Sequence, residues 1–271
     1  MVRAVVISRL TDARRRRYIE ETVPANWTWS FLDAVDGFAP ETIAADLHSL
    51  VAPTFWGNPR LKPGAIGCFL SHYRAWEMCA AGTSPLVVFE DDIAVGPNQD
   101  LNAAVDGALS GGDADVVFVN RSVVRWREQF FAETMATQPP VAALAVVVEG
   151  LVSAGGVPRP NGPGGYGYVL TPAGAETLCA LAQRVGTVIG VDWFLVAAGI
   201  AGTDLADGEW KTPAHAVRCL GGVDMPLRVG IAADWLVGRN NVKAGDSVIE
   251  HGNAVDAAAY RERLGQECAA D

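Results

Sequence analysis

The sequence lacks three features that would each place it in a large class of proteins. No segment approaches the roughly 20 apolar residues that a helix needs to cross a bilayer. The 271 residues carry a formal net charge of −10, so neither nucleic acid nor an anionic lipid surface is an expected partner. No cysteine pair has the C-x-x-C spacing of a zinc site or redox motif; the five are Cys68, Cys79, Cys179, Cys219 and Cys268. We therefore expect a soluble protein with reduced thiols, cytoplasmic or peripheral at the inner face of the membrane.

Several glycine-marked motifs are also missing. The glycines of "GGYGYVL" precede an expected strand instead of following one, so the dinucleotide fingerprint is absent, and no G-x-x-x-x-G-K-[ST] loop occurs. There is no G-x-S-x-G elbow either. Ser71 and His72 are neighbours, and neighbours on a helix face directions about 100° apart, which disfavours a serine–histidine hydrolase.

What the sequence does contain is a regular alternation of expected strands and helices. Apolar runs predict strands over 3–8, 29–37, 85–89, 114–120 and 166–170. Helical periodicity and capping residues predict helices over 11–23, 40–50, 61–82, 101–109, 171–185, 190–200 and 254–271. This alternation favours the α/β fold class, with a mainly parallel sheet covered by helices on both faces.

Three adjacent carboxylates, Glu90, Asp91 and Asp92, follow directly on the apolar run "PLVVF". Ligands of open α/β sheets bind at the carboxyl ends of strands. An extended backbone turns Glu90 and Asp92 to one side and Asp91 to the other. Two carboxylates on one side suit Mg²⁺ or Mn²⁺, which keep coordination positions for phosphate oxygens and water. A solvated acidic turn is the alternative.

Two further places offer polar side chains whose role the residues alone leave open. Ser71 and His72 are either hydrogen-bonding groups near a ligand, with Gly67 letting their helix approach closely, or satisfied core groups. Asp192 begins an apolar helix. It is either the N-cap of that helix or a carboxylate that accepts a proton from a sugar hydroxyl.

Taken in order, the motifs resemble glycosyltransferase family 25, the bacterial lipooligosaccharide galactosyltransferases and their relatives in collagen glycosylation. The resemblance covers roughly Val2 to Leu195 and rests on "VVISRLTDARRRR", "FLDAVDG", "LKPGAIGCFLSHYRAWE", "VVFEDDI", "GYGYVLTPAGAETL" and "VDWFL". It implies a GT-A fold with a Rossmann-like, mainly parallel sheet. It also implies a UDP-sugar donor, usually UDP-galactose, and Mn²⁺ or Mg²⁺.

The resemblance further implies roles for individual residues. The metal ligands would be Asp92 and Glu90. The donor would be bound by Ser8, Asp36, Gly37, Ser71, His72, Arg74, Glu90 and Asp91. The acceptor side would hold Tyr166 and Asp192, and the expected catalytic residues are His72 and Asp192, with Asp192 as the base that activates the acceptor hydroxyl for an inverting attack.

We predict a GT-A domain over 1–235, with a donor half over about 1–125 and an acceptor half over about 126–235, followed by a C-terminal extension over 236–271 that packs on the domain. His215 or His251 could complete the metal site, and the Gly/Pro-rich loop over 150–165 would suit an acceptor-binding flap. The expected partners are the nucleotide-sugar donor and a hydroxyl-bearing glycan, peptide or small molecule.

Two other functions compete with this one. A nucleotidyltransferase would need a glycine-rich basic loop after the first strand, and "SRLTDARRRR" has arginines but no glycine. A catalytically inactive glycan- or partner-binding protein with the same fold is the other alternative. The intact acidic triplet disfavours it, because three uncompensated carboxylates are costly to keep.

Overall fold

The computed structural model describes residues 2–51, 62–96, 99–110, 113–120, 141–144, 164–187, 189–200, 227–232, 235–240 and 257–265. Its strands are β1 (Arg3–Ser8), β2 (Trp29–Asp33), β3 (Leu86–Glu90), β4 (Ile93–Val95), β5 (Val116–Phe118), β6 (Val141–Ala143), β7 (Gly167–Leu170), β8 (Val229–Ala232) and β9 (Val237–Arg239). Within the described ranges they form a seven-stranded sheet in the order β2-β1-β3-β7-β5-β8-β6 and a separate pair, β4-β9.

The large sheet is mixed but mainly parallel. β1 pairs in parallel with both β2 and β3, and β5 pairs in parallel with β8. β7 lies antiparallel between β3 and β5, and β6 runs antiparallel to β8. The other strands of this sheet, β1, β2, β3, β5 and β8, all run in the same direction. The α/β fold class is therefore confirmed. The carboxyl ends of β1, β2 and β3 meet at one edge of the sheet.

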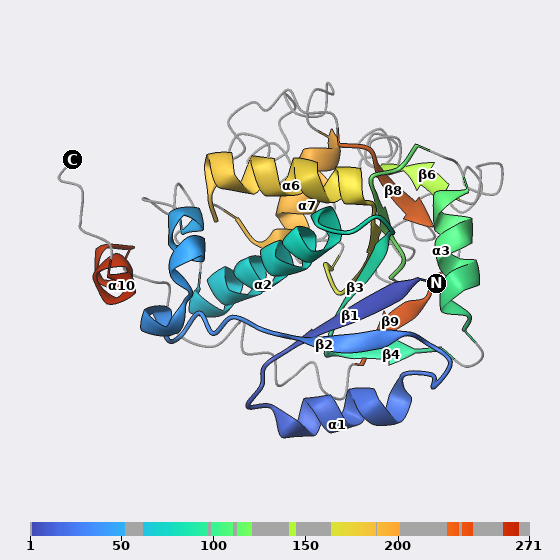
Figure 1. The fold of residues 1–271 in the computed structure, drawn as a ribbon, viewed down its shortest axis with the longest axis horizontal. Helices are drawn as coiled ribbons and strands as arrows, with labels where there is room; N and C mark the ends of the chain where they lie inside the picture. The colour runs from blue at the N-terminus through green and yellow to red at the C-terminus, as the bar shows by residue number, and fades with distance from the viewer. Residues whose placement is uncertain are drawn as a thin grey trace, which may run out of the picture.

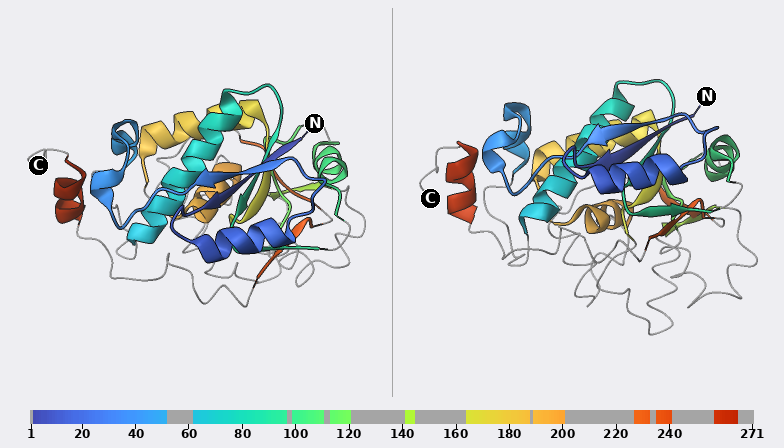
Figure 2. Two further views of the ribbon diagram at one scale, coloured as in Figure 1. Left: turned by 60° about the horizontal axis from the view of Figure 1, so that its bottom comes forward. Right: turned by 90° about the horizontal axis from the view of Figure 1, so that it is seen from below.

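The helices cover both faces of this sheet (Figures 1 and 2). They are α1 (Ala13–Thr22), α2 (Pro63–Ala80), α3 (Leu101–Leu109), α6 (Pro172–Val185) and α7 (Val191–Ile200). A further helix, α10 (Ala257–Leu264), lies to one side of the sheet (Figure 1). One core joins α2, α6 and α7 to Val5 and Val88, and the other joins α1 and α3 to Ala4 and Val87. Successive strand residues thus serve opposite cores, as the period of two requires.

One predicted helix is wrong. The segment over 40–50 forms two short 3-10 helices, η1 (Pro40–Thr42) and η2 (Ala45–Leu50). Ile43 and Ala44 between them are extended, with ψ of 129° and 139°. Ile43 is buried in the core below α2, so packing of this side chain overrides the local helical preference.

Two glycines allow α2 to lie directly against the segment that follows β2. A Cβ atom on Gly67 would lie 2.5 Å from the Val35 carbonyl oxygen, and one on Gly37 would lie 1.8 Å from the Pro63 carbonyl oxygen. Ser71 fastens the contact, since its Oγ donates to the Gly67 carbonyl at 2.6 Å and accepts from the Val35 amide at 2.8 Å. Gly67 therefore permits close approach to backbone at this point.

The far end of the chain returns to this same region. β9 pairs antiparallel with β4, just beyond the acidic triplet. On α10, Tyr260 donates to the Gly37 carbonyl at 2.8 Å and Arg263 donates to the Phe38 carbonyl at 3.1 Å. Both elements fall in the predicted extension over 236–271, so part of that segment contacts the loop after β2 and the turn after β3.

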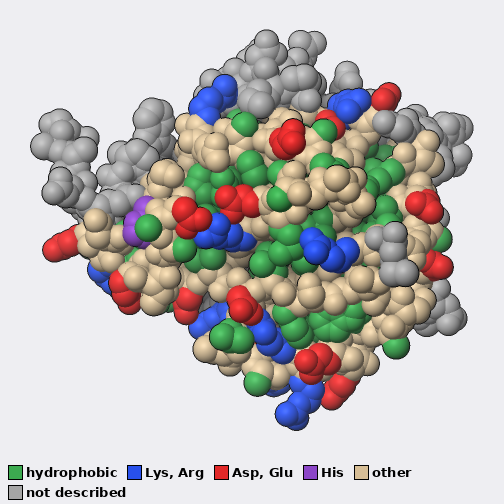
Figure 3. Space-filling view, in the orientation of Figure 1, with side chains coloured by type: hydrophobic (Ala, Val, Ile, Leu, Met, Phe, Trp, Pro, Cys, Tyr) green, Lys and Arg blue, Asp and Glu red, His purple; other side chains and the backbone are tan. Residues whose placement is uncertain are grey.

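The described helices include none that is both long enough and apolar enough to cross a membrane. On the described part of the face that Figure 3 shows, acidic and basic side chains lie interspersed and do not gather by sign.

Candidate functional site

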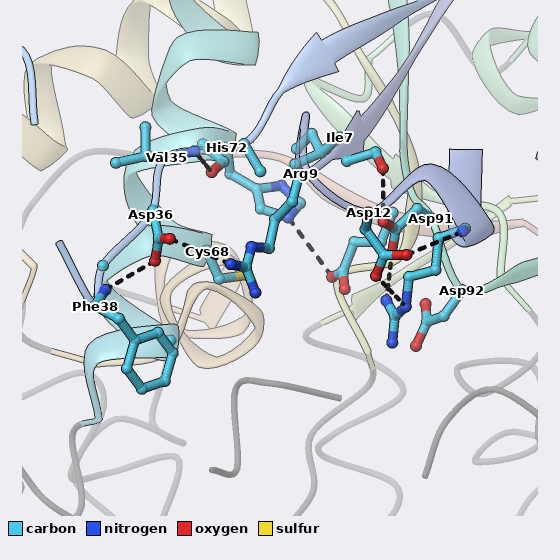
Figure 4. A pocket seen from close by; sticks show the side chains of 17 residues that line it. Ile7, Arg9, Asp12, Val35, Asp36, Phe38, Cys68, His72, Asp91 and Asp92 are labelled. Atoms are coloured by element: carbon cyan, nitrogen blue, oxygen red, sulfur yellow. Dashed lines mark hydrogen bonds and ion pairs between the residues drawn. The ribbon is translucent and has the colours of Figure 1, made fainter. Parts of the chain in front are cut away.

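A pocket opens at the carboxyl ends of β1, β2 and β3 (Figure 4). Asp36 and Phe38, after β2, line one side of it, and Asp91 and Asp92, after β3, line the other. Its walls include eight of the predicted site residues: Ser8, Asp36, Gly37, Ser71, His72, Glu90, Asp91 and Asp92. Residues that are up to 84 positions apart in the chain therefore meet because three parallel strands end together.

Asp91 is fully occupied by protein partners. Its Oδ2 accepts from Ser8 Oγ at 2.8 Å, and its Oδ1 forms a buried ion pair with the Arg15 guanidinium. Arg15 is held in place by the start of α1, where the Asp12 side chain caps the Arg15 amide at 3.1 Å. Burial raises the pKa of Asp91, and the charge of Arg15 opposes that rise. Asp91 thus joins the end of β3 to β1 and α1.

Asp92 is also buried, but only one of its oxygens is used. Oδ2 accepts from Arg239 Nε at 3.0 Å, while Oδ1 has no hydrogen-bond partner among the described residues. A buried oxygen without a partner costs about 1–3 kcal/mol. A divalent cation prefers oxygen ligands of this kind. The residues therefore fit a cation that binds Asp92 Oδ1.

Glu90 and Asp192 carry strongly raised pKa values. Burial, with help from Asp92 and Asp91, raises the pKa of Glu90 to about 8. Burial and the charge of Glu90 raise the pKa of Asp192 to about 7. Like charges held close together in a poorly hydrated region disfavour ionisation, and a positive ion among them would offset the part of each rise that the neighbouring carboxylates cause.

The partners of His72 define its protonation. Its Nδ1 lies 2.8 Å from Tyr168 Oη, which also accepts from Trp76 Nε1 at 2.8 Å. Because Oη already receives the indole hydrogen, its own hydrogen points to Nδ1, and we infer that the ring carries its proton on Nε2. That atom lies 3.6 Å from Glu90 Oε1. Burial lowers the pKa of His72 to about 4, which keeps the ring neutral.

Other predicted donor residues have partners within the protein. Asp36 pairs with Arg9 at 3.2 Å and accepts from the Phe38 amide at 3.0 Å, which shapes the loop after β2. Arg74 instead forms ion pairs with Asp46 and Glu77, both at 2.8 Å. It lies on α2 but is not among the described residues that line the pocket, because this ion-pair network holds it toward η2.

The two predicted acceptor residues lie behind the acidic turn. The Tyr166 side chain is buried, and its carbonyl accepts from the Glu90 amide at 3.2 Å. Asp192, near the start of α7, accepts from the Gly165 amide at 2.6 Å and so ties α7 to the segment before β7. Neither lines the pocket of Figure 4. The two histidines left open as metal ligands, and most of the loop over 150–165, fall outside the described residues.

Sequence reasoning missed the arginines that pair with the acidic triplet. Arg15 belongs to the run of arginines over 14–17, and its spacing from the Asp12 cap could have singled it out. Arg239 has no local signal, because it lies 147 residues from Asp92 and reaches it only through the pairing of β9 with β4. Tyr168, which contacts His72, and Trp76, which donates to Tyr168, resemble ordinary core aromatics in the sequence.

A mainly parallel sheet with a carboxylate-lined pocket at its strand ends is consistent with a GT-A-like glycosyltransferase fold. The family model of glycosyltransferase family 25 (LPS biosynthesis protein) matches residues 1–149, more than half of the chain. The chain belongs to this family, and the predicted resemblance is confirmed.

Curated relatives fall in two groups. "Lipooligosaccharide biosynthesis protein lic2B" of Haemophilus influenzae is 32% identical over 103 residues, which are 37% of either chain. "Probable inactive glycosyltransferase 25 family member 3" of Bos taurus is 29% identical over 196 residues, which are 67% of this chain and 29% of that protein. "Inactive glycosyltransferase 25 family member 3" of Mus musculus is similar to the same extent over 190 residues. The match thus spans less than a third of these mammalian relatives.

Proposed function

We propose that this protein transfers a hexose from a UDP-sugar to an acceptor hydroxyl with inversion of configuration, and that the reaction needs Mn²⁺ or Mg²⁺. Galactose is the first candidate for the hexose. Membership of the family supports glycosyl transfer. The observation that carries the cation dependence is Asp92, whose Oδ1 is buried at the end of β3 without a hydrogen-bond partner among the described residues. The pocket beside it has polar residues on two opposite sides, Asp36 on one and the acidic triplet on the other, so both ends of a donor molecule could be contacted.

In this proposal Asp92 and Glu90 would hold the cation, whose positive charge would stabilise the diphosphate as it leaves. Asp91 would not bind the cation, because Ser8 and Arg15 already occupy its two oxygens; these contacts fix the end of β3. Asp36, across the pocket, would face the uridine part of the donor.

Asp192 is our proposed base. A general base works best with a pKa near the working pH, and the pKa of Asp192 is raised to about 7. The Gly165 amide fixes one carboxylate oxygen at 2.6 Å, which orients the other for an acceptor hydroxyl. The name of the Haemophilus relative, a lipooligosaccharide biosynthesis protein, supports a saccharide acceptor.

A non-catalytic binding protein is the second candidate, because the mammalian relatives are named inactive. The two candidates differ in turnover. A transferase releases UDP from its UDP-sugar when an acceptor, or water in its place, is present. A binding protein would hold the UDP-sugar and release no UDP.

The test is calorimetric titration of UDP in Mn²⁺ and again in EDTA, with Asp92→Asn as the variant. We expect binding that requires Mn²⁺ and that Asp92→Asn weakens strongly. Asp113→Asn is the matched control, since the Asp113 side chain is 87% exposed and its ion pair is with the exposed Arg228, away from the pocket. Binding that neither EDTA nor Asp92→Asn changes would refute the cation site.

A further inference from the structure

Three metal-binding side chains lie together in the wall of the pocket. Cys68 and His72 are one helical turn apart on α2, and Glu90 ends β3. One ligand atom from each lies within 4.8 Å of the other two. His72 Nε2 and Glu90 Oε1 are 3.6 Å apart, which is too long for a hydrogen bond. Two ligands of a tetrahedral zinc ion stand about 3.3–3.6 Å apart, given bonds of about 2.0–2.3 Å.

His72 supplies a second, independent observation. Its side chain is fully buried, and Nε2 has no hydrogen-bond partner among the described residues. The other ring nitrogen is held by Tyr168 Oη at 2.8 Å. A histidine that binds a metal through one nitrogen is usually held through the other by an outer partner in this way. A buried nitrogen without a partner is costly, so a ligand at Nε2 would remove that cost.

We infer that Cys68, His72 and Glu90 form a zinc site with its fourth position open to the pocket. Thiolate and imidazole select zinc or cobalt, whereas magnesium and manganese prefer an all-oxygen set, so this site differs in kind from the one at Asp92. Zinc at Nε2 moves the ring proton of His72 to Nδ1, where Tyr168 Oη accepts it. A search of the sequence for cysteine pairs misses the group because only one of its ligands is a cysteine.

The site has a consequence for the proposed function, and this consequence alone rests on that function. Glu90 belongs both to the zinc site and to the proposed Mn²⁺ site, so zinc is expected to compete with Mn²⁺-dependent UDP binding. The zinc site itself depends only on the three side chains.

Cobalt is the probe, because a thiolate bound to Co²⁺ gives a near-ultraviolet charge-transfer band. We expect the wild-type protein to bind one equivalent of Co²⁺ with this band, and Zn²⁺ to remove the band on addition. Cys68→Ser should abolish it. Glu90→Gln should weaken Zn²⁺ binding by more than about tenfold, since the loss of even an outer partner costs about 10–100-fold.

Cys179→Ser is the control, because this half-buried thiol on α6 belongs to no group of possible metal ligands among the described residues. The Co²⁺ charge-transfer band should persist in this variant. A wild-type protein without the band would overturn the proposal. So would a band that survives Cys68→Ser, or one that disappears in Cys219→Ser instead. None of these readouts needs UDP, so a failed UDP titration with an intact cobalt band would count against the transferase alone.

Discussion

Replacing Tyr168 by phenylalanine tests how the core supports the pocket. Its hydroxyl accepts from Trp76 Nε1 and contacts His72 Nδ1, both at 2.8 Å, and all three side chains are fully buried. Tyr168→Phe keeps the ring and its packing against His72 but removes the one atom that serves both partners.

The expected loss of stability follows from those two partners. Each buried polar atom that loses its hydrogen bond costs about 1–3 kcal/mol, so the pair should cost about 2–6 kcal/mol in the free energy of unfolding. Tyr73→Phe is the matched control. Tyr73 Oη accepts from Gln183 Nε2 at 2.9 Å, and Gln183 lies at the exposed edge of α6, where water can take its place, so the loss should cost about 0.5–1.5 kcal/mol.

Urea denaturation measures both variants, and nitrogen NMR of the His72 ring reports which nitrogen carries the proton. The wild-type ring should carry it on Nε2, and Tyr168→Phe should remove that preference. A stability loss below about 0.5 kcal/mol in Tyr168→Phe, or a wild-type ring protonated on Nδ1, would refute the reasoning about this hydrogen-bond network.

Two further predictions concern packing and pH. Gly67→Ala should destabilise the protein by about 1–3 kcal/mol, because its Cβ would lie 2.5 Å from the Val35 carbonyl oxygen. The control is Gly107→Ala on α3, whose Cβ would meet no atom within 4 Å; it should be neutral or stabilising by up to about 1 kcal/mol. Equal effects of the two variants on denaturant unfolding would contradict this reasoning. Without metal, thermal stability should fall as pH rises from about 4 to 8. The folded-state pKa values of Asp192 and Glu90 are raised to about 7 and about 8, so the stability that their protonated forms contribute at low pH is lost as the pH rises through these values. Asp192→Asn should flatten the dependence of the melting temperature on pH. An unchanged slope in this variant would contradict the prediction.

Much of the fold could be predicted because the strands are strongly apolar and the helices well punctuated. The run over 3–8 is buried at every position after Arg3, and α2 begins at Pro63 and ends just before Gly82, as its capping residues indicate. The short strands β4, β6 and β9 could not be predicted in the same way. Each has three residues, too few for a period, and β9 pairs with β4 across more than 140 positions of the chain.

The candidate site was predictable in place but not in detail. The acidic triplet and its position after β3 were visible in the sequence, and so was the alternation that separates Asp91 from its neighbours. Which carboxylate is neutralised was not visible, because that depends on Arg15 and Arg239, which arrive from other elements. Arg74 lies nearer to the triplet in sequence than either, yet η2 provides Asp46 as its partner.

The charge balance around the triplet connects the protonation of the pocket with its affinity for cations. Arg15 neutralises Asp91 and Arg239 shares Asp92, but neither forms an ion pair with Glu90 among the described residues. Burial, together with the charges of Asp92 and Asp91, raises the pKa of Glu90 to about 8, so in the metal-free protein a proton occupies the place that a cation would take. A cation that binds here must displace that proton, so its affinity should rise with pH up to about 8 and level off above it. An affinity for Mn²⁺ that is independent of pH would mean that the cation binds elsewhere.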